Sequence, residues 1–308
     1  MAHVAARPPA LLGYTQKITC GFWHVDVLIT AYLAATGLLI AAFYSRVPDA
    51  GWLLAAHAVA IALIAAAAKI EPGEGMGGYR LVSIFRYWYP LPFVAACYKE
   101  MAILIPPTRG IALDAQVAAL DYRIWGANPT VWLENISAPW LTEFLQIAYT
   151  LFVPAVLLVA AVLWKQGRLQ EFRYYALLIS AGFLASYLGY WLVPVRGPRF
   201  LLAHLQTSEL RGLWLFPYLQ HALDKLESAH YDCFPSGHVE LTLLACWGSR
   251  LISTNLFRTY FVYSLVIVFA TVYLRYHYTI DVFAGALVSA VLIAVLERFH
   301  RESAYRRG

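Results

Sequence analysis

Long runs of apolar residues constrain this chain more than any other feature of its sequence. An α-helix needs about 20 mostly apolar residues to cross the roughly 30 Å hydrocarbon core of a bilayer. The clearest runs of that length are 24–44, 52–70, 139–164, 172–193, 257–275 and 278–298. The interrupted run 81–105 and the short run 238–253 bring the count to about eight. The sequence therefore predicts an all-α, polytopic transmembrane helical bundle.

The composition also favours a bilayer as the surroundings of these runs. The chain has 308 residues, of which 61% are hydrophobic and 13% are charged. That is more apolar side chain than one globular core can bury. The segment before the first run has no apolar core of its own, so we predict no cleaved signal peptide. Segment 111–127 carries Asp114, Asp121 and Arg123 among apolar residues, and we expect it to lie at the membrane interface.

The basic residues predict the orientation of the bundle. The formal net charge is +5, but the basic residues stand singly at the ends of apolar runs, which excludes a nucleic-acid-binding stripe. By the positive-inside rule the face with the most Lys and Arg residues is cytoplasmic. The residues on that face are Lys165, Arg168, Arg173, Arg250, Arg258, Arg298, Arg301, Arg306 and Arg307. With about eight spans, Arg7 and Lys17 lie on the same side.

Counting spans outward from the loop 194–237 brings three separated motifs to the opposite face. The run 172–193 delivers the chain to Arg196, the run 238–253 leaves the same face at His238, and two more crossings return to His277. We therefore expect these motifs to converge on the extracytoplasmic face of a plasma or inner membrane.

The middle motif is Pro235-Ser236-Gly237-His238. Ser236 can cap the helix that follows, and the free N–H groups of that helix end, including that of Gly237, attract phosphate. His238 would lie in the first turn, where an imidazole can protonate a leaving oxygen near neutral pH. The alternative is an ordinary helix start, with His238 making a local hydrogen bond.

The last motif places His277 four residues before Asp281, on one face at the start of the final span. Asp281 is costly in an apolar helix unless it is paired. If it accepts from one ring nitrogen of His277, the other nitrogen becomes the better nucleophile. A mutual helix cap is the alternative.

Arg196-Gly197-Pro198-Arg199 follows a long apolar run. The guanidinium groups of Arg196 and Arg199 could bind phosphate oxygens through paired donors. The alternative is that both side chains extend from the interface towards water.

The cysteines give no sign of a metal centre. Cys20, Cys97, Cys233 and Cys246 lack metal-ligand spacing, and two lie inside apolar runs, where a thiol behaves as a small hydrophobe. No metal-ligand cluster is visible in the sequence. We predict neither a metal nor a cofactor.

In this order and spacing the three motifs resemble the type 2 phosphatidic acid phosphatase superfamily of membrane lipid phosphatases and phosphotransferases, over roughly 170–300. The middle motif matches unchanged, and His277 with Asp281 resembles the His-x-x-x-Asp of the third motif, in a similar setting that ends at Gly285. The domains implied are amino-terminal spans in 1–80 and a catalytic membrane domain in 81–308, with a core of about six helices.

Two departures from that family concern the phosphate site. The usual Arg of the third motif is replaced by Thr271, and the Lys of the first motif is absent. Arg275 lies one helical turn from position 271 and is expected to substitute. The Gly-Pro-Arg form of the first motif and the number of spans look more like the inositol phosphorylceramide synthase branch.

The resemblance implies a phosphohistidine mechanism. His277 would attack phosphorus, Asp281 would stabilise the imidazolium, and His238 would protonate the leaving group. Arg196, Arg199, Arg275, Ser236 and the Gly237 amide would bind the phosphate. We predict a lipid phosphate phosphatase acting on a phospholipid or a prenyl (pyro)phosphate. The alternatives are transfer of a headgroup phosphate to an alcohol acceptor, and a lipid-phosphate transporter or binding protein without catalysis.

Overall fold

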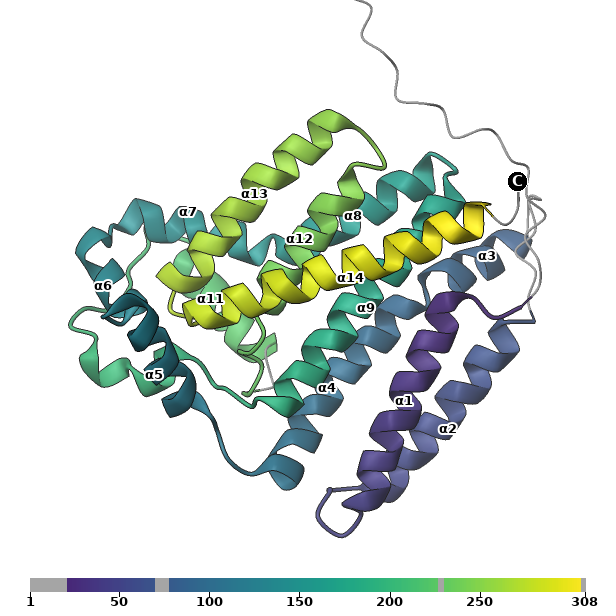
Figure 1. Ribbon diagram of the computed structural model, residues 1–308, viewed down its shortest axis with the longest axis horizontal. Coiled ribbons are helices and arrows are strands. Elements are labelled where there is room, and N and C mark those ends of the chain that lie inside the picture. The colour runs from purple at the N-terminus through teal and green to yellow at the C-terminus, as the bar shows by residue number, and fades with distance from the viewer. Residues whose placement is uncertain (1–20, 70–77, 227–229, 306–308) are drawn as a thin grey trace, which may run out of the picture.

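The computed structural model describes residues 21–69, 78–226 and 230–305, and within them the fold is all-α (Figure 1). Extended chain pairs there only in an isolated bridge between Val195 and Asp232. The helices are α1 His24–Ala42, α2 Ala50–Ala67, α3 Gly78–Trp88, α4 Pro90–Arg109, α5 Asp114–Trp125, α6 Pro129–Trp132, α7 Pro139–Thr150, α8 Phe152–Lys165, α9 Leu169–Leu192, α10 Pro198–Leu201, α11 Phe216–Leu226, α12 Gly237–Ser249, α13 Thr254–Tyr273 and α14 Thr279–Tyr305. Two 3-10 turns are η1 Leu133–Ile136 and η2 Ala203–Leu205.

Five of the described helices are long and apolar enough to cross a membrane, namely α1, α2, α9, α13 and α14. Helices α7 and α8 together form a sixth candidate, bent by 42° at the break between them. Pro154 explains the bend, because it has no N–H to donate to the carbonyl of Thr150 and its ring crowds that group. The prediction of an all-α polytopic membrane fold is confirmed.

Two predicted spans differ from the structure. The run 81–105 is divided between α3 and α4, because Pro90 cannot donate to the Arg86 carbonyl. The run 238–253 forms α12, whose 13 residues cover only about 20 Å. Helices α4 and α12 nevertheless pack against α9 inside the bundle. The expected count of about eight thus compares with five or six helices that are long and apolar enough.

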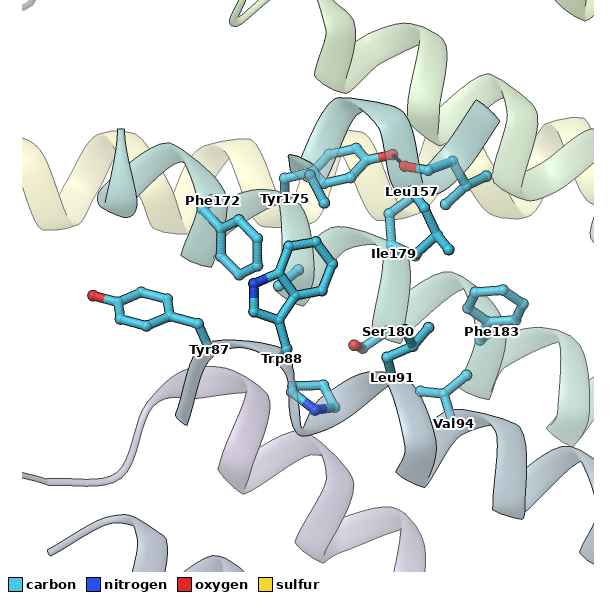
Figure 2. Close-up of a pocket in the computed structure, with 14 residues that line it drawn as sticks. Tyr87, Trp88, Leu91, Val94, Leu157, Phe172, Tyr175, Ile179, Ser180 and Phe183 are labelled. Carbon is cyan, nitrogen blue, oxygen red and sulfur yellow. Dashed lines mark hydrogen bonds between the residues drawn. The ribbon is translucent and has the colours of Figure 1, made fainter. Parts of the chain in front are cut away.

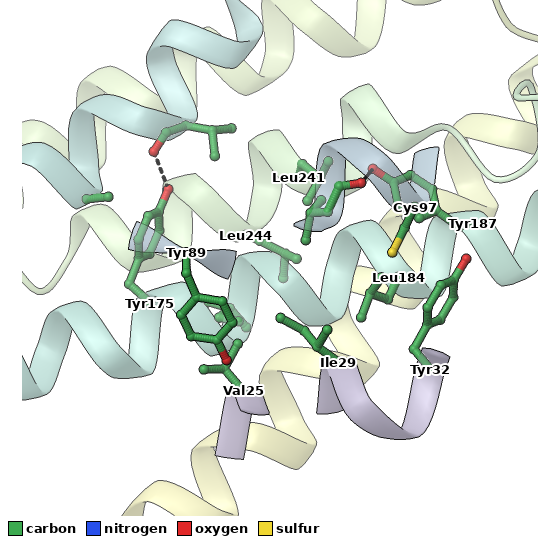
Figure 3. Close-up of a cluster of buried hydrophobic side chains, with 14 of the residues drawn as sticks. Val25, Ile29, Tyr32, Tyr89, Cys97, Tyr175, Leu184, Tyr187, Leu241 and Leu244 are labelled. Atoms are coloured by element: carbon green, nitrogen blue, oxygen red, sulfur yellow. Dashed lines mark hydrogen bonds between the residues drawn. The ribbon is translucent and has the colours of Figure 1, made fainter. Parts of the chain in front are cut away.

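The main hydrophobic core lies where α1, α4, α9 and α12 meet (Figure 3). Ile29, Leu184 and Leu244 belong to it and are almost fully buried. Gly182 permits the close approach of α9 to α12, since a Cβ there would lie 2.5 Å from Leu244 and 2.9 Å from Leu241. Small residues commonly allow such contacts between membrane helices.

A buried ion pair connects the amino-terminal hairpin of α1 and α2 to the rest of the bundle. Arg86 on α3 donates to the Asp26 carboxylate at 2.6 and 2.9 Å, and neither side chain is exposed. The guanidinium also lies 3.8 Å from the centre of the Trp23 ring. Paired in this way, the two charges are tolerated in an apolar environment.

A small apolar crevice lies between the end of α3 and helices α4, α8 and α9 (Figure 2). Trp88, Leu91, Val94 and Phe183 are among its lining residues. None of the predicted site residues lines it. The motifs instead gather at the other side of the bundle, where α13 ends and α14 begins beside α5 (Figure 1).

Candidate active site

Backbone contacts join the three motif segments. The Cys233 amide donates to the Val195 carbonyl at 3.1 Å, and the Ser236 amide donates to the Asp281 carbonyl at 3.0 Å. A Cβ added at Gly197 would lie 2.9 Å from the Tyr276 carbonyl oxygen, so only glycine fits at this position of the first motif. Segments separated by tens of residues therefore meet at one place.

Two aspartates of α5 hold the first and last motifs in position. Asp114 accepts the backbone N–H groups of Arg196 and Gly197 at 2.8 to 3.1 Å. Asp121 accepts the backbone N–H groups of Thr279 and Ile280 at 3.1 and 3.0 Å, and so caps α14. Both carboxylates are buried. Burying a charged carboxylate in an apolar segment is costly, so these two aspartates signal that partners exist, although the sequence did not reveal which ones.

Pro235-Ser236-Gly237-His238 starts α12 as the sequence predicts. Ser236 is the N-cap and its side chain accepts from the Val239 amide at 3.4 Å. Ser236 is fully buried, and Gly237 lies so close to the Tyr190 hydroxyl that a Cβ would come within 2.6 Å of it. His238 is partly exposed in the first turn of α12.

The Nδ1 atom of His277 is held by a backbone carbonyl. It lies 2.8 Å from the Cys233 carbonyl oxygen but 3.6 Å from the nearer Asp281 oxygen, which is beyond hydrogen-bond range. A carbonyl only accepts, so Nδ1 must carry the proton, and neutral His277 keeps its lone pair on Nε2. Helix α14 begins at Thr279, so His277 precedes the helix.

Asp281 is held by other donors. Its Oδ2 accepts from the Cys233 thiol at 2.9 Å and from the Tyr278 amide at 2.8 Å, while Oδ1 has no partner although it is buried. The carboxylate thus acts on His277 through its charge at 3.6 Å, and the direct hydrogen bond that the sequence suggested is made by Cys233 instead. Nothing in the spacing identified Cys233.

His238 lies in an aromatic stack. Its ring stacks on Tyr149 with centroids 4.0 Å apart, and its Nδ1 lies 3.1 Å from the Tyr149 hydroxyl. The rings of His238 and His277 are 6.1 Å apart. Within the described part of the chain, no protein group hydrogen-bonds to Nε2 of either ring. A hydroxyl can donate or accept, so His238 can carry its proton on either nitrogen.

Arg199 and Arg196 lie at the edge of this stack. The Arg199 guanidinium is 5.2 Å from the Tyr276 ring centre, and Tyr276 stacks on Tyr149 at 4.5 Å. Arg199 also pairs with Asp224 at 2.7 Å. The Arg196 side chain is exposed and lies over the ring of Phe200.

Arg275 is placed differently from the other two arginines. It pairs with Glu134 at 2.7 Å and donates to Gln206 and the Ser208 carbonyl at 2.9 Å. Burial lowers the pKa of Arg275, and the negative charge of Glu134 opposes that shift. The guanidinium therefore connects η1 to the loop after η2, and its predicted role in binding phosphate remains a prediction.

One group of side chains has the ligand types of a metal site. The ligand atoms of Cys233, His277 and Asp281 all lie within 4.8 Å of one another, and all three residues are buried. The sequence did not predict this group, because Cys233 and His277 are distant in the chain and share no ligand spacing.

Comparison with known proteins agrees with this geometry. A family model described as the PAP2 superfamily matches residues 115–295, which is more than half of the chain and includes all three motifs. No curated protein and no solved structure matches the chain.

Proposed function

The chain belongs to the PAP2 superfamily, and from that premise we propose that it is a membrane phosphatase that hydrolyses a lipid phosphate through a phosphohistidine. Members of the superfamily are generally phosphatases or phosphotransferases. The apolar helices support a membrane-embedded protein. The substrate class we propose is a phospholipid or a prenyl (pyro)phosphate.

The observation that carries this proposal is the pairing of two histidines with Nδ1 engaged and Nε2 free. The Nε2 lone pair of His277 attacks phosphorus, forming the N–P bond while the bond to the lipid oxygen breaks. His238, in its imidazolium form, gives its Nε2 proton to that oxygen and becomes a neutral imidazole. In the second step water attacks the phosphoenzyme, His238 removes the proton of the water, and the N–P electron pair returns to His277.

The charges around the rings support both steps. His277 becomes cationic as the N–P bond forms, and the Asp281 carboxylate 3.6 Å away stabilises that charge. The Nδ1–H bond to the Cys233 carbonyl holds the ring in one orientation throughout. We propose Arg199 and Arg196 as the cations that neutralise the phosphate oxygens, together with Ser236 and the Gly237 amide at the start of α12. Arg275 is paired with Glu134, and we expect it to contribute less to phosphate binding.

A specific observation favours a second candidate, the transfer of a headgroup phosphate to an alcohol. Asp232 is partly exposed beside the site and its carboxylate accepts from the Tyr98 hydroxyl at 2.6 Å. A carboxylate repels phosphate but accepts hydrogen bonds from hydroxyl groups. Asp232 would thus suit a hydroxylated headgroup, in agreement with the resemblance to the inositol phosphorylceramide synthase branch.

We further propose that the site lies on the extracytoplasmic face of a plasma or inner membrane. The loop 166–168 between α8 and α9 and the loop 250–253 between α12 and α13 lie at the other ends of these helices and carry the basic residues Arg168 and Arg250. The positive-inside rule makes that end cytoplasmic. Arg7, Lys17, Arg306 and Arg307, which entered the same argument, lie outside the described residues.

Metal-free protein purified in detergent and given a diacyl phosphate or a prenyl pyrophosphate tests the proposal. Hydrolysis predicts release of inorganic phosphate without an alcohol. Release only after an alcohol acceptor is added would replace the phosphatase with the transferase. The His277→Ala variant should lose turnover, and equal turnover in the variant and the parent would rule out catalysis through His277. If neither protein releases phosphate and both bind lipid equally well, a non-catalytic binding or transport function replaces both activities.

A further inference from the structure

We propose that Cys233, His277 and Asp281 form a binding site for a divalent transition-metal ion such as Zn²⁺, one that switches the enzyme off. The three side chains offer a sulfur, a nitrogen and an oxygen, which are the ligand types zinc takes in proteins. The atoms involved are the Cys233 Sγ, the His277 Nδ1 and an Asp281 carboxylate oxygen. None of these is the Nε2 atom assigned to catalysis.

The distances suit a tetrahedral ion. Ligands at about 2.0–2.3 Å from zinc lie roughly 3.3–3.7 Å from one another. The Cys233 Sγ is 3.5 Å from the His277 Nδ1, and that nitrogen is 3.6 Å from the Asp281 Oδ2. The sulfur and the carboxylate oxygen are 2.9 Å apart because a hydrogen bond joins them, and this separation widens once the ion replaces the thiol proton.

The charges suit a dication. Cys233, His277 and Asp281 are 2%, 4% and 0% exposed, and a buried carboxylate without a counter-charge is costly. A thiolate and a carboxylate together neutralise a divalent ion, so the cluster becomes neutral. The Asp281 Oδ1 atom is buried and makes no hydrogen bond. This carboxylate therefore has unused acceptor capacity beside the proposed ion.

Metal binding moves two protons. The Cys233 S–H bond breaks and its proton leaves to solvent, because the thiolate is the metal ligand. The His277 ring loses the proton on Nδ1 and gains one on Nε2, since a neutral imidazole carries one proton. The Cys233 carbonyl oxygen, 2.8 Å from Nδ1, is then released and close enough to complete the coordination in place of water.

The consequence for activity rests on the proposed function. With a proton on Nε2, His277 has no lone pair to attack phosphorus, so the bound metal blocks formation of the phosphohistidine. Mg²⁺ should not have this effect, because it prefers oxygen ligands in octahedral geometry.

Cobalt is the probe that tests the site without turnover. Co²⁺ titrated into metal-free full-length protein should produce thiolate-to-metal absorption, and Zn²⁺ but not Mg²⁺ should remove it. Cys246→Ala, which removes a different buried thiol, one that lies within α12, should keep the band. Cys233→Ser and Asp281→Asn should lose it or weaken it, with elution from a sizing column checking that each variant is folded. No band in the parent, or a full band in Cys233→Ser, would overturn the proposal.

A second measurement separates this proposal from the proposed function. Zn²⁺ should inhibit turnover of the parent and of Cys246→Ala at the concentrations at which it displaces Co²⁺, and a chelator should restore activity. If Zn²⁺ displaces Co²⁺ while turnover continues unchanged, the metal site stands and His277 is not the nucleophile. Inhibition that persists in a folded Cys233→Ser variant would overturn the switch.

Discussion

The Cys233 carbonyl oxygen lies 2.8 Å from the Nδ1 of His277, closer than the Asp281 carboxylate at 3.6 Å. The residue three positions before Ser236 therefore orients the imidazole of the last motif. Two tasks that one carboxylate performs in a Ser-His-Asp triad are divided here. Cys233 fixes the tautomer, and Asp281 contributes negative charge.

Replacing Asp281 with Asn should lower kcat without abolishing it. Asn retains an oxygen that can accept from Cys233 and the Tyr278 amide, and the Cys233 carbonyl still fixes the tautomer. The variant loses the charge that stabilises cationic His277, worth roughly 1–3 kcal/mol or about 5- to 150-fold in kcat. Steady-state kinetics beside His277→Ala would check this. A loss near 10⁴, typical of a carboxylate that sets the tautomer, would assign that task to Asp281.

Tyr149→Phe should lower kcat while changing KM little. The ring still stacks on His238, but the hydroxyl 3.1 Å from its Nδ1 is lost. Nδ1 then has no hydrogen-bond partner while Nε2 gives a proton to the leaving group and takes one from water. One neutral hydrogen bond corresponds to about 2- to 10-fold in rate. Tyr263→Phe is the matched control, since its hydroxyl donates to the Ala148 carbonyl at 2.8 Å. Equal losses in both variants would contradict a role specific to His238.

The ion pair of Arg275 with Glu134 should matter more for stability than for phosphate binding. Arg275→Ala leaves the Glu134 carboxylate, whose side chain is 10% exposed, without its cation, which costs about 1–3 kcal/mol. Glu134→Gln should cost a similar free energy, and both variants should have a lower Tm. Inhibition by product phosphate should stay unchanged in both variants. If Arg275→Ala weakens phosphate inhibition and Glu134→Gln does not, Arg275 binds phosphate as the sequence suggested.

The sequence predicted the helical membrane fold because hydrophobic run length depends only on local composition. It also predicted that the segments of Arg196, His238 and His277 come together, since successive helices run in opposite directions even where one of them, α12, is too short to cross a bilayer. The lengths of individual helices were harder to predict from the sequence. The position of Pro90 within the run 81–105 and the short α12 show that a helix inside a bundle can end before it crosses the bilayer.

The details of the site depended on contacts between distant residues. Cys233 lies beside His277 and Asp281 because the loop before α12 pairs with Val195. The sequence placed Asp114 and Asp121 at the membrane interface, because their hydrogen-bond partners lie far away in the chain, in the first and last motifs. Neither the periodicity nor the motif spacing carries information about such partners.

The tight contact at Gly182 predicts that Gly182→Ala destabilises the bundle and weakens catalysis through α12. The added Cβ would lie 2.5 Å from Leu244, 2.9 Å from Leu241 and 3.3 Å from the Glu240 Oε1. These three α12 side chains crowd the same point of α9, so we expect them to repack and α12, with His238, to be displaced. Overpacking of this kind costs about 1–3 kcal/mol. Gly51→Ala on α2 is the control, because its Cβ would meet only the Tyr44 hydroxyl, at 3.3 Å. The Tm of thermal unfolding and kcat should both fall for Gly182→Ala and not for Gly51→Ala. Unchanged values in Gly182→Ala would mean that α9 and α12 can accommodate the methyl group without moving the site.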